Sequence, residues 1–241
     1  MDKKHFPPNE DLINGQQLLL SKPLGWTSFD MVGYIRRLLR EHRQLPKIKI
    51  GHAGTLDPLA TGLLIICTGK YTKRIIEFTE MEKEYTGTFI LGATRPSFDK
   101  ETEIDQTYPT DHLTAEQIYQ AATHFTGDQK QIPPIFSATK IKGIPAYMYA
   151  RDKQQVVIEP KNIRISEFKI TSIRLPEVDF QIVCSKGTYI RAIARDFGRY
   201  LSSGAHLDSL CRTRIGPYLL EHAIGAEDLL QSLAGEKQIW D

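Results

Sequence analysis

The sequence lacks the signatures of several common protein classes. Its three cysteines lie far apart and form no Cys-x-x-Cys pair, which argues against both a disulfide framework and a zinc site. The seven histidines show no HExxH or other ligand spacing, so we expect no metal. The apolar run Leu63–Cys67 is far too short to span a bilayer, and the first residues lack the apolar centre of a targeting segment. These absences predict a cytoplasmic protein without a membrane segment.

Motifs for nucleotide binding and for serine hydrolases are also missing. Gly69 and Lys70 are followed by Tyr71, and the position five residues before Gly69 is Leu64, so the Walker A spacing fails. Neither GxGxxG nor GxSxG occurs in the chain. The sequence therefore gives no support to a P-loop enzyme, a dinucleotide-binding fold or a nucleophile elbow.

Charge is nearly balanced in number but uneven in position. Among 241 residues, 31 Lys and Arg oppose 29 Asp and Glu, a net charge of +2. Residues 36–49 carry six basic side chains and one acid, Glu41. A second basic cluster consists of Lys186, Arg191, Arg195, Arg199, Arg212 and Arg214. This asymmetry indicates a face for a polyanion, although solvated helix faces explain charge alone equally well.

Hydrophobic periodicity predicts an α+β fold with a mixed or antiparallel central sheet flanked by helices. The expected strands are Gln17–Leu20, Leu63–Cys67, Glu84–Leu91, Ile163–Ile173 and Val178–Cys184. The first expected helix begins at Thr27 or Ser28 and runs through Phe29, Val32, Ile35 and Leu39. The other expected helices cover Tyr71–Thr79, His112–Phe125 and Thr188–Leu201. In the last of these, the arginines at 191, 195 and 199 are expected along an exposed flank.

One segment, GHAGTLDPLATGLLIIC at 51–67, places three glycines and one proline around a single carboxylate. Pro58 disfavours helical backbone at Asp57, and glycine permits close approaches that other residues resist. A shaped turn that leads into a buried strand would present Asp57 from a rigid base, as a catalytic group requires. Taken alone, the dipeptide also fits an Asp-Pro turn that only caps local amides.

Six segments together resemble the TruB-type tRNA pseudouridine synthases. They are KPLGWTS at 22–28, GHAGTLDPLATG at 51–62, KEY at 83–85, QIPPIFSATKIKGIPAYMYAR at 131–151, CSKGTYIRAIARDFG at 184–198 and GAHLDSLCRTRIGPY at 204–218. Their order matches the family and they cover nearly the whole chain. The resemblance implies the pseudouridine synthase catalytic fold, with a loop-rich RNA-binding insertion at about 128–152.

The resemblance also implies the reaction and its residues. Uridine at position 55 of the tRNA T-loop is flipped out, its N1–C1′ bond is broken, and C5 is joined to C1′. No cofactor or metal is implied, and the expected partner is the tRNA T-stem-loop, bound by a monomer. The implied catalytic residues are Asp57, Arg191 as its ionic partner, and Tyr85 as the stacking platform. The implied substrate-binding residues are His52, Tyr189, Leu210 and Lys22, the last with Pro23 shaping the pocket floor.

Two departures from the family pattern affect the expected organisation. The chain ends about two dozen residues after the last motif, so we expect one catalytic domain at 1–241 and no separate PUA domain. The segment TRPSFD at 94–99 keeps only part of the family's Thr/Asp-rich pattern, which makes Asp99 a weaker site candidate than Asp57. The insertion, with basic and aromatic side chains interleaved, fits either a mobile arm that closes on RNA or an ordered loop.

Two other functions compete with the enzyme. A non-catalytic RNA-binding or tRNA-chaperoning protein on the same fold would have little reason to keep Asp57 with Arg191 and Tyr85. A glycoside hydrolase needs a pair of carboxylates, and Glu80, Glu82 and Glu84 beside a strand look like surface charge. The combination of Asp57 with its expected partners favours the pseudouridine synthase.

Overall fold

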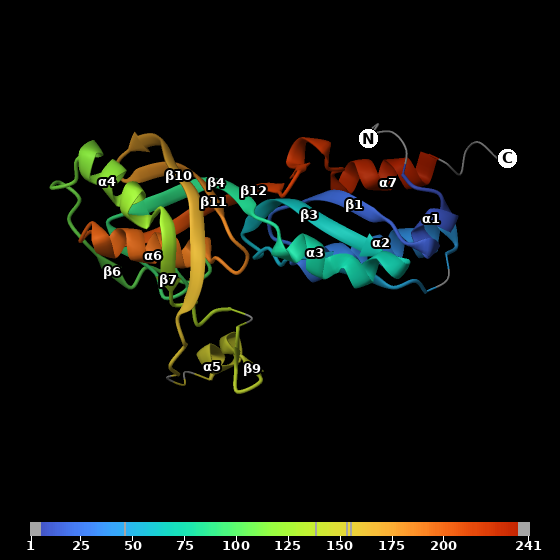
Figure 1. Cartoon of the computed structure of the whole chain (residues 1–241), viewed down its shortest axis with the longest axis horizontal. Helices are drawn as coiled ribbons and strands as arrows, with labels where there is room; N and C mark the ends of the chain where they lie inside the picture. Colours follow the sequence, from blue (N-terminus) through green and yellow to red (C-terminus); the bar gives the residue numbers. More distant parts are fainter. Residues whose placement is uncertain (1–5, 46, 138, 153, 155, 236–241) are drawn as a thin grey trace. The chain divides into compact units, whose positions relative to one another are not determined.

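The computed structural model describes residues 6–45, 47–137, 139–152, 154 and 156–235. Ala138 of the expected insertion and both ends of the expected 1–241 domain lie outside the described residues. The chain divides into two compact units, Met1–Glu84 with Cys211–Asp241, and Tyr85–Leu210 (Figure 1). Strands and helices are mixed in both units, which confirms the α+β class. Among the described residues, no helix is long and apolar enough to cross a bilayer.

The first unit is built from helices around a small sheet. Its elements are α1 (Asn9–Asn14), β1 (Gln17–Lys22), α2 (Ser28–Arg43), β2 (Ile50–Ala53), β3 (Ala60–Thr68), the 3-10 helix η1 (Gly69–Arg74), α3 (Ile75–Glu80), β13 (Tyr218–Leu219), the 3-10 helix η2 (Leu220–His222) and α7 (Ala226–Gly235). Strand β3 is the centre of this sheet, with β1 and β2 paired to it in antiparallel register.

The apolar run in β3 is buried on both of its faces. Leu64 and Ile66 pack into a core with side chains of α1, α2, β1 and α7. Leu63, Ile65 and Cys67 point the other way, into a core with Phe78 of α3. Because successive side chains of a strand alternate between faces, a strand covered on both sides reads as a continuous apolar run.

Helix α2 begins where its capping residues predict. Thr27 is the N-cap, and its side chain accepts from Asp30 N at 3.0 Å while Asp30 accepts from Thr27 N at 2.8 Å. This reciprocal pairing satisfies two backbone donors that a helix start leaves open. The expectation that Phe29 lies on the apolar face is wrong, since Phe29 is 69% exposed and Met31 is buried in its place.

The second unit contains a larger sheet and two covering helices. Its elements are β5 (Ala93–Thr94), β6 (Gln106–Thr107), α4 (Ala115–Phe125), β7 (Gly127–Gln131), β8 (Lys140–Ile141), β9 (Ile144–Pro145), α5 (Ala146–Arg151), β10 (Lys161–Arg174), β11 (Glu177–Cys184) and α6 (Ile190–Tyr200). Strands β4 (Lys83–Leu91) and β12 (Ala205–Ile215) begin in one unit and end in the other. The strand order here is β12-β4-β11-β10-β7.

An aromatic core joins the sheet of this unit to α6. Phe89 of β4 stacks on Phe180 of β11 with ring centroids 4.2 Å apart, and Phe197 of α6 lies 5.5 Å from Phe89. Phe168 of β10 completes the cluster. These contacts fix α6 against the strands, so the first turn of α6 is a rigid place for functional side chains.

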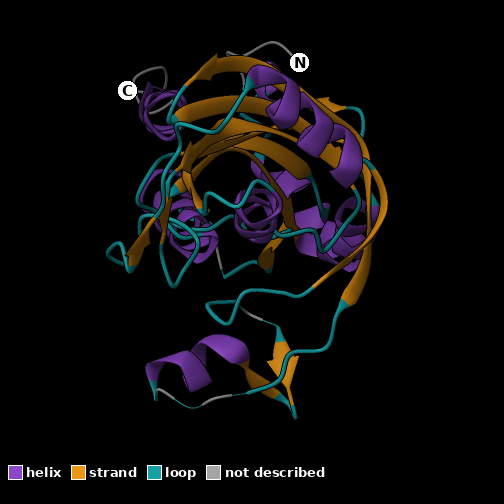
Figure 2. Cartoon of the chain, turned by 90° about the vertical axis from the view of Figure 1, so that its left-hand side faces the viewer, coloured by secondary structure: helices purple, strands orange, loops and turns teal. Residues whose placement is uncertain are grey.

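The boundaries of several predicted elements differ from the structure. Helix α4 begins at Ala115 because Thr114 forms a capping box with Gln117, so His112 precedes the helix. The segment predicted as one helix over 71–79 is a 3-10 turn followed by α3. The insertion leaves the sheet after Gln131, since 127–131 pair with β10 as β7. Figure 2 shows the short β8, β9 and α5 as a small piece at the far end of β7 and β10.

Candidate active site

Asp57 lies in the turn that joins β2 to β3. The two strands pair with His52 opposite Ile66, and the turn closes with Ala60 N donating to Asp57 O at 3.0 Å. Pro58 disfavours helical backbone at the preceding residue. The side chain of Asp57 is half-buried at the start of β3.

A buried arginine, Arg212 of β12, holds the backbone beside Asp57. Its side chain is 1% exposed. Nη2 donates to Gly54 O at 3.1 Å and Nη1 to Thr55 O at 3.4 Å. Nε donates to Leu63 O at 2.8 Å, so one guanidinium bridges the end of β2 and the start of β3. The rigid fork of an arginine suits such a set of fixed acceptors.

Ser28, at the start of α2, holds the residue immediately before Asp57. Leu56 N donates to Ser28 Oγ at 2.8 Å, and Ser28 Oγ donates to Leu56 O at 3.3 Å. Both partners are buried, so water competes little for these bonds. The hydroxyl thereby fixes the peptide that leads into Asp57.

Lys22, at the end of β1, contacts the backbone on the other side of Asp57. Its side chain is fully buried. Nζ donates to Trp26 O at 2.6 Å, to Pro23 O at 2.9 Å and to Pro58 O at 3.5 Å. Burial lowers the pKa of Lys22 to about 8, and the nearby Asp57 charge opposes that shift. These contacts favour a structural role for Lys22 in holding the turn, whereas its place in a pocket floor and its binding of substrate stay predictions.

Two glycines make the close packing of this turn possible. Gly54 has φ of 88° and Gly62 has φ of 107°, backbone angles that favour glycine. A Cβ on Gly62 would lie 2.4 Å from the Arg212 carbonyl oxygen. The backbone of β12 therefore approaches β3 at a distance that only glycine allows, which brings the Arg212 side chain within reach of the turn.

His52 stands on β2 close to the same arginine. Burial is the main cause that lowers the pKa of His52, and the charge of Arg212 lowers it further. The imidazole is therefore neutral at neutral pH. A neutral ring, half-buried beside the turn, suits contact with a base or sugar better than with a phosphate.

Arg191 lies in the first turn of α6 and is 3% exposed. Its Nη2 donates to Phe136 O at 3.0 Å and its Nη1 to Ser97 O at 3.4 Å. Its Nε forms an ion pair with Asp99 Oδ2 at 3.5 Å. Asp99, the weaker candidate in the sequence, is thus a buried carboxylate against Arg191 within the second unit. Pairing of Arg191 with Asp57 stays a prediction.

The expectation of an exposed arginine flank on α6 is confirmed only for Arg199. The Arg199 side chain is 71% exposed, whereas Arg195 is 8% exposed. Arg195 forms two bonds with Asp196, at 2.7 and 2.8 Å, and lies over the ring of Phe98. Its Nη2 also donates to Ile132 O at 3.1 Å. Burial is possible because an acid, a carbonyl and an aromatic ring contact the guanidinium.

Tyr189 is the N-cap of α6 and is fixed by the insertion and by β7. Gln131 accepts from Tyr189 N at 2.8 Å and donates to Tyr189 O at 3.1 Å. The Tyr189 hydroxyl lies 3.0 Å from Thr139 Oγ1. The ring therefore has a set direction and a polar contact with the insertion.

Tyr85 and Leu210 stand where the chain passes between the units. Tyr85 of β4 is the first residue of the second unit and is 8% exposed. Leu210 of β12 is the last and is half-buried. Their expected contacts with a flipped uracil stay predictions.

The structure brings the expected residues into two groups. His52, Lys22 and Asp57 surround one turn in the first unit, and Tyr189 and Arg191 start one helix in the second. The side chains that hold the turn within 54–62 come from the segment 22–28 and from Arg212. Two of them, Ser28 and Arg212, were not predicted as site residues from the sequence. The described residues contain no group of three or more His, Cys, Asp or Glu that could hold a metal ion.

Comparison with known sequences finds one family across most of the chain. A family model described as TruB family pseudouridylate synthase (N terminal domain) matches residues 36–190. The tRNA pseudouridine synthase B of Flavobacterium johnsoniae is 55% identical over 216 residues, 89% of this chain and 94% of the relative. That of Bacteroides fragilis is 53% identical over 210 residues, 87% of this chain and 90% of the relative.

Comparison with solved structures finds a similar fold. The crystal structure of a Cbf5-Nop10-Gar1 complex contains a chain that matches with a TM-score of 0.71 and 27% identity. The match covers 93% of this chain and 56% of the solved chain, so this chain spans little more than half the length of that structure.

Proposed function

Because the chain belongs to the TruB family of pseudouridylate synthases, we propose that it isomerises uridine 55 in the T-loop of tRNA to pseudouridine, with Asp57 as the catalytic aspartate. The enzyme class is an isomerase that makes pseudouridine in tRNA. The relatives that share more than half of their aligned residues with this chain are named tRNA pseudouridine synthase B. The target position comes from the motif resemblance.

One observation carries the role of Asp57. Side chains hold the backbone on both sides of it, through Arg212 on Gly54 and Thr55, through Ser28 on Leu56 and through Lys22 on Pro58. A surface turn needs no such set of buried donors, whereas a catalytic carboxylate gains rate from a fixed position.

The reaction balances without an added reagent. The N1–C1′ bond breaks, the C5–C1′ bond forms, C5 loses its proton and N1 gains one. The change is redox-neutral, so no oxidant or reductant enters. Asp57 attacks the sugar, adds to the base, or removes a sugar proton, and all three routes need the carboxylate ionised.

The remaining site residues serve the flipped base and the carboxylate. Flipping a base costs a few kcal/mol, and stacking on an aromatic ring returns roughly 1–3 kcal/mol. We assign that stacking to Tyr85, with Tyr189 and Leu210 lining the pocket and His52 contacting the RNA. Arg191 is assigned as the ionic partner of Asp57.

Mapping of the product tests the proposed function. An unmodified tRNA transcript is incubated with the protein, treated with carbodiimide and read by primer extension. The expected result is a new stop at uridine 55 and none in a transcript that carries cytidine there. Binding and refolding of tRNA without any new stop would instead support the non-catalytic RNA-binding alternative.

Assembly and location complete the proposal. The protein acts as a cytoplasmic monomer, so light scattering of the purified chain is expected to give the 27.4 kDa of one copy. A mass of two copies would contradict the monomer.

A further inference from the structure

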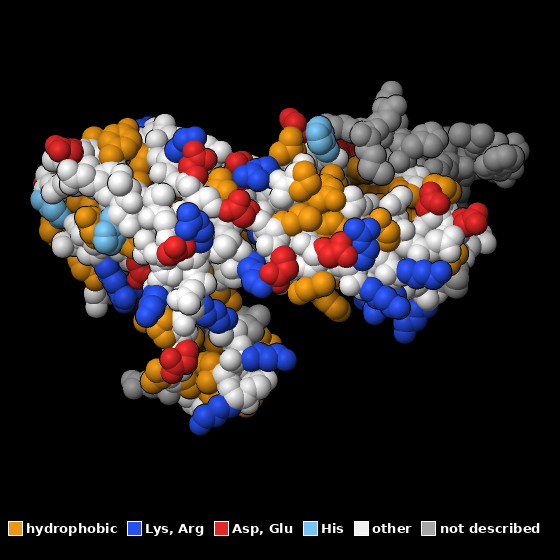
Figure 3. Space-filling view, in the orientation of Figure 1, with side chains coloured by type: hydrophobic (Ala, Val, Ile, Leu, Met, Phe, Trp, Pro, Cys, Tyr) orange, Lys and Arg blue, Asp and Glu red, His pale blue; other side chains and the backbone are white. Residues whose placement is uncertain are grey.

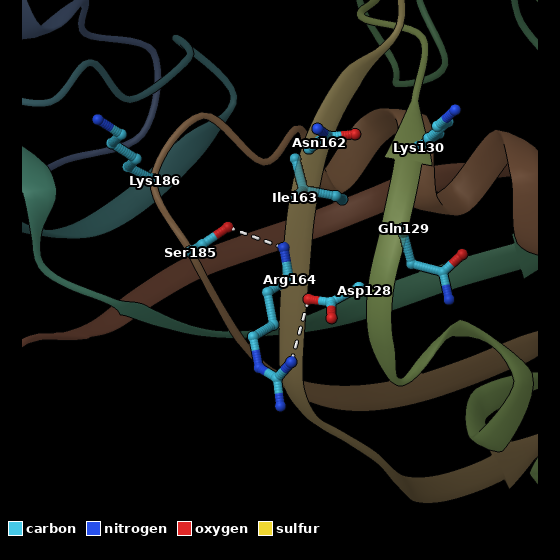
Figure 4. A pocket seen from close by; sticks show the side chains of 8 residues that line it. All are labelled: Asp128, Gln129, Lys130, Asn162, Ile163, Arg164, Ser185 and Lys186. Atoms are coloured by element: carbon cyan, nitrogen blue, oxygen red, sulfur yellow. Dashed lines mark hydrogen bonds and ion pairs between the residues drawn. The ribbon is translucent and has the colours of Figure 1, made fainter.

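A hollow of about 640 Å³ lies beside the last two strands of the larger sheet. Its lining comes from three segments, namely β7, β10 and the loop after β11 (Figure 4). The polar side chains used below are Asp128, Lys130, Asn162, Arg164, Ser185 and Lys186. We call this feature the β7–β10 groove.

The groove carries an excess of positive charge. Lys130, Arg164 and Lys186 contribute three cations, and Asp128 contributes the single acid of the lining. Arg164 Nη1 pairs with Asp128 Oδ1 at 3.0 Å, and both side chains are more than half exposed. An exposed pair of this kind is weak, so a phosphate can take the place of Asp128 at little cost. Figure 3 shows further Lys and Arg side chains where β7 and β10 lead to the insertion, and on the insertion itself, which lies below them in this view.

The shape of the groove is fixed by hydrogen bonds between its segments. Ser185 N donates to Arg164 O at 2.9 Å, and Arg164 N donates to Ser185 Oγ at 2.9 Å. Lys130 and Asn162 stand opposite each other in the register of β7 and β10. The backbone that carries these three exposed cations is therefore held in a fixed arrangement.

A direct structural link joins the groove to Tyr189. Gln131 follows Lys130 on β7 and binds both the N–H and the carbonyl of Tyr189. Lys186 precedes Tyr189 by three residues in the loop that leads into α6. Successive side chains of a strand alternate between faces, so Lys130 and Gln131 lie on opposite faces of β7, and the link from the groove to Tyr189 and Arg191 runs through the loop that carries Lys186.

We propose that the β7–β10 groove binds the sugar-phosphate backbone of the tRNA next to the flipped uridine. The proposal rests on the proposed function, because it takes tRNA as the substrate. Basic side chains together with Ser, Asn and Gln are the groups that contact phosphate and sugar in nucleic-acid complexes. Such contacts set register and orientation, so the groove positions the target without reading the base.

The test measures tRNA binding at several salt concentrations. The double variant Lys130→Gln with Lys186→Gln is compared with the wild type by filter binding to an unmodified tRNA transcript. Removing two phosphate contacts is expected to raise Kd roughly tenfold at 0.1 M salt. The negative slope of the logarithm of the association constant against log salt is expected to become shallower by about 1.4 to 1.8. KM for tRNA rises in parallel while kcat stays near the wild-type value.

A matched control separates the groove from overall charge. Lys100→Gln with Lys169→Gln removes two exposed cations of the same unit outside the groove. This pair is expected to leave Kd within about twofold of wild type. Equal weakening by both double variants, or an unchanged Kd for the groove variant, would overturn the proposal.

Asp128 supplies a test of opposite sign. Asp128→Asn removes the acid that occupies Arg164, so tRNA binding is expected to tighten by roughly threefold. Weaker or unchanged binding would count against the groove.

If the proposed function fails, wild type makes no pseudouridine, whereas failure of the groove alone leaves turnover and KM of the double variant unchanged.

Discussion

At the scale of residues, the distinctive feature is how few side chains fix the position of Asp57. Arg212, Ser28 and Lys22 together contact the backbone from Gly54 to Pro58. None of the three is exposed to solvent, and two of them are cations. Buried cations are costly unless their hydrogen bonds are satisfied, and here carbonyl oxygens satisfy them. The arrangement indicates that Arg212 acts as a positioning residue for Asp57.

Replacing Arg212 tests this role. Arg212→Met leaves the carbonyls of Gly54 and Leu63 unpaired, which costs about 1–3 kcal/mol of stability, and frees the turn. We expect kcat to fall by about 10- to 100-fold with KM for tRNA little changed. Arg212→Lys, which keeps the charge and some bonds, is expected to recover part of kcat. Assays well below the unfolding temperature separate positioning from stability, and a folded Arg212→Met with wild-type kcat would refute the role.

Arg191 gives a second prediction at this scale. Its guanidinium is buried and bound to Phe136 O, Ser97 O and Asp99. If it also stabilises Asp57 during the reaction, Arg191→Ala lowers turnover far more than it weakens tRNA binding. Single-turnover rates and filter binding on the same preparation measure both. Arg199→Ala, on the exposed flank of α6, is the control and is expected to change neither.

At the scale of elements, the approach of β12 to β3 sets the geometry of the turn. Gly62 lies opposite Lys22 in the register of β1 and β3 and against the backbone of Arg212. The same position thus controls two of the side chains that hold Asp57. A change at Gly62 acts on the element and not on any catalytic group.

Gly62→Ala is expected to destabilise the protein strongly. It combines a positive φ with a Cβ 2.4 Å from Arg212 O, so the strands must separate. We expect a loss of more than about 2 kcal/mol in the free energy of unfolding, with lower kcat. Gly25→Ala is the matched control, with φ of 83° and open space around the added Cβ. A loss for Gly62→Ala no larger than for Gly25→Ala would show that the close approach is unimportant.

The sequence predicted much of this level and missed specific parts of it. The strands at 17–22, 60–68, 83–91, 161–174 and 177–184 follow from alternation and apolar runs, and α2 and α6 follow from their apolar faces and, for α2, its cap. Strand β12 was not predicted, because HLDSLCRTR mixes polar and apolar residues without a clear period. Arg212 and Arg195 read as surface charge, since burial of an arginine depends on carbonyls and rings brought from distant segments. Asp57 could be recognised from the sequence because the glycines and the proline that shape its turn are its near neighbours along the chain.

At the scale of the whole molecule, buried histidines couple folding to pH. His206 of β12 is 3% exposed, and its Nδ1 lies 3.1 Å from Ala93 O. Burial is the largest cause that lowers the pKa of His206, and burial also lowers that of His52. The unfolded chain therefore takes up protons near pH 6.5, while the folded chain does so only at lower pH.

The sign of the pH effect follows from this difference. Between pH 6.5 and the folded pKa values the unfolded state binds more protons, so stability falls as pH drops through that window. We expect Tm to decrease from pH 7 to pH 5.5, with a smaller decrease in His206→Asn, which keeps a donor but does not titrate. His222→Asn, at an exposed position, is measured in parallel as the control for a histidine-to-asparagine change. A steeper decrease in His206→Asn than in wild type would contradict the account.

The central claim is that one fixed carboxylate, Asp57, performs the isomerisation. Tritium release from tRNA that carries [5-³H]uridine measures it most directly, because C5 loses its hydrogen only when C5 is joined to C1′. We predict that wild type releases the label of one T-loop uridine and that Asp57→Asn, which keeps the shape of the turn, releases none while still binding tRNA. Release by Asp57→Asn at a rate near that of wild type would contradict the claim.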